Sequence, residues 1–289
     1  MSCCLTKNKN NAFVKRKYYY LVAGLQDISL DIHKLTFDQL AFRNELKTEL
    51  HPKDYPLVEK IFLPFDNINL LNLLQKNDKP FNAKGNFSKD RLEENIKETN
   101  DLPNYMQKFI HAYKNQDPFF PDMNPENELT TLYYDEVISG EQNEFLKEWL
   151  QFELNVKNIM TALNARKYKV PYEHQVIGTD EVSETIRKSH ARDFGLSNEL
   201  DYMEELTAIS RKDDIREREQ AIDDMKWKYL DEHTFFHYFT IEKILSFVIR
   251  LGMIERWLHI DKDHSNELFK KLLKELQSSY ELPETFKEK

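Results

Sequence analysis

Two histidines four residues apart are the first candidates for chemistry in this chain of 289 residues. His233 and His237 could share one helix face beside the carboxylate of Asp231 or Glu232 and hold the metal of a hydrolase. Such a site needs further ligands from another element, and the sequence has none at matched spacing. We therefore favour a structural role for both histidines, at the start of a helix with aromatic packing, and expect no bound metal.

Other catalytic signatures are incomplete or missing. Asp193, Phe194 and Gly195 spell the DFG triplet of protein kinases, but no glycine-rich loop, VAIK lysine or HRD loop accompanies them. We expect Gly195 to end a helix. The sequence has no Walker A, GxSxG or GxGxxG motif, and its two cysteines are Cys3 and Cys4. We therefore predict a protein that is not an enzyme and needs no cofactor.

A row of polar side chains on one predicted helix is the second kind of candidate. Apolar residues from 145 to 163 recur at steps of four and three, which is typical of a buried helix face. Beside them runs a second row, where a solvated helix would carry lysine and glutamate. This row consists of Glu148, Gln151, Asn155, Asn158, Ala162 and Ala165.

Seven polar residues near this row and near the end of the chain are the candidate site residues. They are Glu153, Asn155, Asn158, Arg166, Arg250, Glu255 and Arg256. They could contact a partner protein or form buried polar contacts that fix how helices pack. We favour the structural alternative, because buried polar groups are ordinarily satisfied within the protein. The carboxylates of residues 217, 219, 223 and 224 are expected to form a solvated face, and the alternative is that they meet a basic partner.

Composition predicts an all-α protein. Only 6 glycines and 10 prolines interrupt the chain, and 31% of its residues are charged, which favours long helices with few tight turns. The apolar spacing predicts helices over 37–50, 55–63, 65–75, 92–97, 102–114, 129–139, 141–168, 180–191, 197–210, 212–230, 239–260 and 265–280. Residues 18–25 suit an extended segment, with a helix start as the alternative. Pro64 is expected to separate two helices, and Ser197 and Asn198 are expected to cap the helix at 197–210.

Charge distribution narrows the choice of partners. Residues 1–17 include five basic residues and no acidic one, and we predict that they form a disordered tail. The remaining body has 36 basic and 50 acidic residues, which disfavours nucleic acid and anionic lipid and favours protein partners. The longest apolar run, 244–254, is shorter than the roughly 20 residues of a membrane span, so we expect no direct membrane insertion.

Faint internal repetition accompanies these patterns. The segment from Phe65 can be set over the segment from Phe152 at an offset of 89 residues, so that Asp66 and Asn69 fall on Asn155 and Asn158. A third, weaker copy would place Glu255 before two apolar residues. The sequence leaves open whether these copies reflect true repetition.

Three segments of the body resemble one known family. They are 153–166, with its acidic-x-polar-x-x-Asn-Ile pattern, 191–258, and the opening Lys-Tyr-Tyr-Tyr-Leu-Val-Ala-Gly-Leu from Lys17. They resemble the central-stalk C-subunit family of the V-type and archaeal-type ATP synthases, a relative of the V-ATPase d-subunit family, and more closely a divergent bacterial branch. The resemblance extends over 17–283. This chain departs from the archaeal pattern at Asn155, Asn164 and 257–259, so its partner contacts are expected to differ in detail.

The resemblance implies a funnel-like bundle of three similar helical domains with pseudo-threefold symmetry. We place these domains at 18–100, 101–205 and 206–289 and expect them to form one rigid unit. Family members are non-catalytic and couple the rotor shaft of the soluble ATPase head to the membrane rotor ring. The implied partners are the shaft subunits and the ring, and the implied location is cytoplasmic, peripheral to the membrane through the complex. The alternatives are a helical metal-dependent hydrolase using His233 and His237, and a generic helical scaffold.

Overall fold

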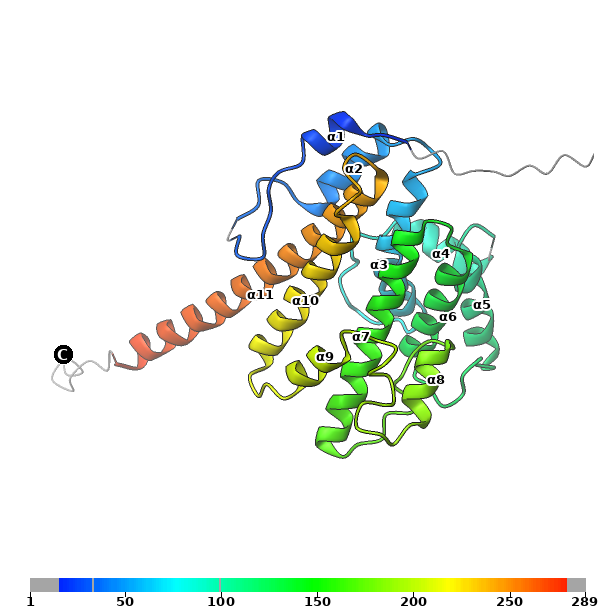
Figure 1. The fold of residues 1–289 in the computed structure, drawn as a ribbon, viewed down its shortest axis with the longest axis vertical. Coiled ribbons are helices and arrows are strands. Elements are labelled where there is room, and N and C mark those ends of the chain that lie inside the picture. Colours follow the sequence, from blue (N-terminus) through cyan, green and yellow to red (C-terminus); the bar gives the residue numbers. More distant parts are fainter. Residues whose placement is uncertain (1–15, 33, 99, 280–289) are drawn as a thin grey trace, which may run out of the picture.

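The computed structural model describes residues 16–32, 34–98 and 100–279, with side chains as far as Asp261. This part of the chain consists of helices joined by loops and contains no strand, which confirms the predicted all-α class (Figure 1). The helices are α1 (Tyr19–Ala23), α2 (Gln39–Glu49), α3 (Tyr55–Leu74), α4 (Lys89–Lys97), α5 (Asn104–Asn115), α6 (Pro125–Gly140), α7 (Glu144–Tyr168), α8 (Glu181–Lys188), α9 (Met203–Ser210), α10 (Ile215–Thr234) and α11 (Ile241–Ser279). Nearly all of the predicted basic tail lies outside the described residues.

One continuous cluster of buried apolar side chains joins these helices, from Leu21 in α1 to Met253 in α11. Helix α6 packs against α3, α5 and α7, while α11 packs against α1, α2, α3, α7 and α10. The N-terminal helices therefore lie against the last one, so the two ends of the described chain share a core. Among the described residues, no helix combines the length and the apolar character that crossing a membrane requires.

Helix α3 is continuous where two helices were predicted. Pro64 lies inside it and has no backbone N–H for the carbonyl of Lys60, one turn earlier. The Tyr133 hydroxyl of α6 donates a hydrogen bond to that carbonyl at 3.1 Å. The prediction of a break at Pro64 was wrong because the missing donor is supplied by a residue that is distant in the sequence.

Helix α11 likewise replaces two predicted helices. Residues 261–264 carry charges and a histidine but neither glycine nor proline, so nothing there ends a helix. Its C-terminal turns extend away from the other helices (Figure 1). The prediction of separate helices over 239–260 and 265–280 was therefore wrong.

Two shorter segments settle further predictions. Residues 19–23 form helix α1, the alternative to an extended segment. Helix α9 begins at Met203 without a side-chain cap, so the predicted cap at Ser197 and Asn198 was wrong. The Ser197 hydroxyl instead donates to Asp193 in the turn before α9, at 2.6 Å. Gly195 lies in this turn with φ of +82° and does not end a helix as predicted.

The offset of 89 residues recurs between helices. Tyr55, the first residue of α3, lies 89 positions before Glu144, the first residue of α7. Pro125 of α6 and Ile215 of α10 are 90 positions apart and also begin their helices. Each of these stretches runs from a long helix through two shorter ones to another long helix. The order and lengths of the helices thus parallel the sequence repeat.

Candidate functional site

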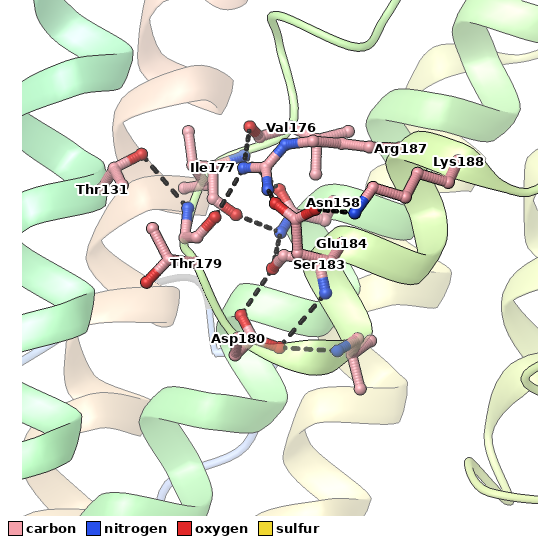
Figure 2. Close-up of polar contacts among 12 residues, drawn as sticks. Thr131, Asn158, Val176, Ile177, Thr179, Asp180, Ser183, Glu184, Arg187 and Lys188 are labelled. Atoms are coloured by element: carbon pink, nitrogen blue, oxygen red, sulfur yellow. Dashed lines mark hydrogen bonds and ion pairs between the residues drawn. The ribbon is translucent and has the colours of Figure 1, made fainter. Parts of the chain in front are cut away.

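Asn158 of α7 lies at the centre of a buried polar network (Figure 2). Its side chain is almost fully buried, and its amide donates to the carbonyl of Ile177 at 2.7 Å and to the Ser183 hydroxyl at 3.0 Å. Its Oδ1 accepts the N–H of Ile177 at 2.9 Å. The amide therefore pairs with both peptide groups of one residue, an arrangement that we call an amide clamp.

The loop held by this clamp leads directly into α8. Asp180 caps the helix by accepting the N–H groups of Val182 and Ser183 at 3.1 and 3.2 Å. Arg187 donates to the Gly178 carbonyl, and the Gly178 N–H donates to Thr131 of α6 at 3.1 Å (Figure 2). Helices α6, α7 and α8 thus fix one loop from three sides.

Asn69 of α3 makes a second amide clamp. Its amide donates to the Asn82 carbonyl at 2.9 Å, and its Oδ1 accepts the Asn82 N–H at 2.8 Å. This loop leads to α4, which Ser88 caps. Asn69 and Asn158 are each the fifteenth residue of their helix. The pair that the sequence repeat aligned therefore makes the same contact.

Asp66 supports the Asn69 clamp one turn earlier in α3. Its carboxylate accepts the N–H groups of Asn86 and Phe87 at 2.9 and 3.0 Å. Burial raises the pKa of Asp66, although these hydrogen bonds act in the opposite direction. A side chain at Gly85 would place its Cβ only 2.4 Å from the Asp66 carboxylate, so this close approach requires glycine.

Glu255, the fifteenth residue of α11, makes a related contact. Its Oε1 accepts the N–H of Gln39, the first residue of α2, and its Oε2 pairs with Lys84. The Gln39 side chain donates to the Val248 carbonyl of α11 at 3.0 Å. It occupies the space beside Gly252, where an added Cβ would lie 2.7 Å from the Gln39 amide nitrogen. Helices α3, α7 and α11 thus each anchor a segment close to the start of a shorter helix.

The other predicted residues of α7 contact α10 and the loops around α8 and α9. Glu153 pairs with Lys226 at 2.9 Å, and the Asn155 amide donates to the Tyr202 hydroxyl at 3.0 Å. Arg166 donates to the Ser189 carbonyl at 2.6 Å, and its guanidinium lies 3.9 Å from the centre of the Phe194 ring. These contacts hold α7 from its middle to its C-terminal end against the segments that follow it.

The two remaining predicted arginines join α11 to α10. Arg250 pairs with Asp231 at 2.6 Å and lies over the Trp227 ring. Arg256 pairs with Asp223, which also accepts the indole N–H of Trp257 at 2.7 Å. Burial alone would lower the pKa of Arg256, but Asp223 and Glu219 raise it above its ordinary value. Asp223 is buried, so the expectation that it belongs to a solvated face was wrong.

All seven predicted residues therefore have partners within the chain. Contacts of this kind favour the structural alternative, which stays a prediction. Sequence reasoning missed the residues that the anchors bind, namely Asn82, Ile177 and Gln39. Each lies within six residues of a cap, Ser88, Asp180 or Asp38. Proximity to a helix-start signal is the one feature that could have pointed to them.

The histidine pair does not lie at a helix start. His233 lies in the last turn of α10, with its ring stacked on Tyr229 at 3.7 Å, and His237 follows in the turn before α11. His237 Nδ1 lies 3.3 Å from the Thr240 hydroxyl and 3.4 Å from Glu242 Oε2. The described residues include no group of three or more His, Cys, Asp or Glu arranged to hold a metal.

The fold and these contacts define the protein as an all-helical one in which three long helices share one pattern of polar anchors. The family model described as "Protein of unknown function (DUF2764)" matches residues 15–280, and the chain belongs to this family. No curated protein and no solved structure is significantly similar to it.

Proposed function

We propose that the protein is a non-catalytic central-stalk component of a V-type ATPase or ATP synthase. In this role it joins the rotor shaft of the soluble head to the membrane ring, and it is cytoplasmic and peripheral to the membrane through that complex. The proposal rests on the resemblance of the sequence to the C-subunit family. The structural observation that carries it furthest is the anchor shared by Asn69, Asn158 and Glu255.

The anchors support an arrangement of three related units around a common axis. One unit runs from α3 to α6 and a second from α7 to α10. The third combines α11 with α2, which Glu255 binds across a separation of 216 residues. In this proposal, α2 from the early part of the chain and α11 from its late part together complete the third unit. The pseudo-threefold funnel would then not consist of three domains that are consecutive in the sequence. Its third unit would combine an early and a late segment of the chain.

Internal anchoring also suits the mechanical demand on such a component. A part that carries torque must transmit strain with little deformation, and close-packed interiors have low compressibility. The polar anchors add directional contacts to the continuous apolar core, so that loops move with the long helices. The acidic body favours partners with basic faces.

Co-purification with the shaft tests this proposal. The tagged protein should retain the shaft subunits of the rotary ATPase from the same cells and should co-purify with the ring after mild detergent extraction. Deletion of its gene should leave ATP hydrolysis by the soluble head intact and should abolish ATP-driven rotation of the ring. Ring rotation that persists after the deletion would refute the proposal.

A further inference from the structure

A cleft lies where three helix ends meet. It has a volume of about 320 Å³, and its lining includes Asn143 and Glu148 near the start of α7, His233 at the end of α10, His237, and Glu242 at the start of α11. Asp54 and Arg16 complete one wall and pair with each other at 2.9 Å. The cleft is thus framed by elements from the beginning, middle and end of the chain.

Glu242 is the feature of this cleft that the internal contacts leave incomplete. The residue is 5% exposed, and its Oε1 accepts a hydrogen bond from the Asn143 amide at 3.1 Å. Its Oε2 is buried without a hydrogen-bond partner, with the His237 ring nitrogen 3.4 Å away. A buried carboxylate oxygen without a donor is unfavourable, and a donor entering the cleft would remove that cost.

The electrostatics of the cleft favour a cationic donor. Burial alone would raise the pKa of Glu242, but its polar neighbours Thr240, Asn143 and His237 lower it, so the carboxylate is ionised at neutral pH. The exposed carboxylates of Glu144 and Glu148 also line the cleft. A lysine or arginine side chain has both the charge and the N–H donors that Glu242 lacks.

Exposed aromatic side chains lie close in the sequence to residues that line this cleft. Phe235, Phe236 and Tyr238 are 64, 80 and 61% exposed and lie in the turn that carries His237. Tyr19 and Tyr20 are 60 and 85% exposed and lie three and four residues after Arg16, which lines the cleft. The ring of Tyr19 lies 4.8 Å from that of Phe239, which brings the two groups together. Aromatic residues are enriched at protein interfaces and often contribute much of the binding energy.

We propose that this cleft and its aromatic surroundings form a docking site for a partner protein segment that presents a lysine or arginine between apolar side chains. The basic side chain enters the cleft beside Glu242, whose side chain turns toward it so that Oε2 accepts a hydrogen bond from the incoming N–H. The apolar side chains beside it cover Phe235, Phe236 and Tyr238. This proposal rests on the cleft alone and does not depend on the rotary assignment.

Fluorescently labelled peptides test the proposal with the full-length protein. One short, capped peptide has a central arginine between leucine and phenylalanine. The matched peptide has citrulline in place of arginine, which keeps the shape of the side chain and removes its charge. Fluorescence anisotropy should show about tenfold tighter binding of the arginine peptide. Glu242→Gln should abolish this preference, whereas Phe236→Ser should weaken both peptides.

Matched controls make the result interpretable. Glu217→Gln removes an exposed carboxylate of α10 outside the cleft, and Phe119→Ser removes an aromatic side chain that is 52% exposed elsewhere. Both controls should bind as the unchanged protein does, and thermal unfolding should show that all four variants are folded. Equal binding of the two peptides, or an unchanged preference in Glu242→Gln, would overturn the proposal. Binding that occurs only when Lys7, Lys9 and Lys15 are all replaced by glutamine would also overturn it, because the chain's own tail would then be the occupant.

Discussion

At the scale of single residues, the three anchors show why two are asparagine and one is glutamate. Asn69 and Asn158 each face both the N–H and the carbonyl of one peptide residue, and a side-chain amide carries both an acceptor and a donor. Glu255 faces a backbone N–H and the Lys84 ammonium, both of which are donors. An ionised carboxylate, which can only accept, suits that position.

Replacing Asn158 tests the amide clamp. Asn158→Ala should lower the free energy of unfolding by about 3 kcal/mol, because the buried N–H and carbonyl of Ile177 lose their partner. Asn158→Asp should cost more, since a carboxylate cannot donate to that carbonyl and would be a buried charge. Urea unfolding measures both. Asn115→Ala, at an exposed position of α5, is the control and should change stability by less than about 0.5 kcal/mol.

The row of polar side chains on the predicted helix at 141–168 indicated which helix positions are polar and close-packed. Asn155 and Asn158 of this row are indeed buried. Their partners could not be inferred from the same pattern. Asn158 binds the backbone N–H and carbonyl of Ile177, so the type of side chain at position 177 does not indicate the contact. Tyr202, which binds Asn155, lies outside any regular helix, where apolar spacing carries no information.

At the scale of elements, α3 shows how one helix depends on another for its continuity. A proline within a helix leaves one carbonyl without its donor, and Tyr133 of α6 supplies a replacement at Lys60. The same phenol ring packs against Tyr105 of α5 and Tyr134. Tyr133 therefore contributes a hydrogen bond and core packing at the point where three helices meet.

A double-mutant cycle measures this dependence. Tyr133→Phe keeps the ring, removes the hydroxyl and should reduce stability by about 1 kcal/mol. In a Pro64→Ala background the new backbone N–H can bond to the Lys60 carbonyl, so the same change should cost less than about 0.5 kcal/mol. Urea unfolding of the four proteins gives the coupling energy. Equal costs in both backgrounds would show that Tyr133 does not compensate for Pro64.

Apolar spacing predicted that helices exist but placed several of their ends incorrectly. The long amphipathic helix at 141–168 is found as α7, because its buried stripe runs along nearly its whole length. Errors arose at Pro64, where a distant hydroxyl intervenes, and between 260 and 265, where a polar stretch was mistaken for a stop. Both are cases in which local sequence does not contain the deciding interaction.

At the scale of the whole molecule, the continuous core predicts one unfolding transition. All three tryptophans, Trp149, Trp227 and Trp257, lie on α7, α10 and α11, whereas Asn69 lies on α3. Asn69→Ala should therefore lower the urea midpoint measured by tryptophan fluorescence as much as that measured by circular dichroism. A fluorescence midpoint that does not move would indicate that the predicted domains unfold separately.

The uninterrupted course of α11 has a mechanical consequence. Its 39 residues, at about 1.5 Å each, span about 58 Å, from the cleft beside Glu242 to turns that lie clear of the other helices (Figure 1). A tilt of roughly 5° at its base would displace its far end by about 5 Å over that length. Because the first half of α11 packs against five other helices, such a tilt would move part of the core with it, so the direction in which the far turns point is tied to the packing of the whole molecule.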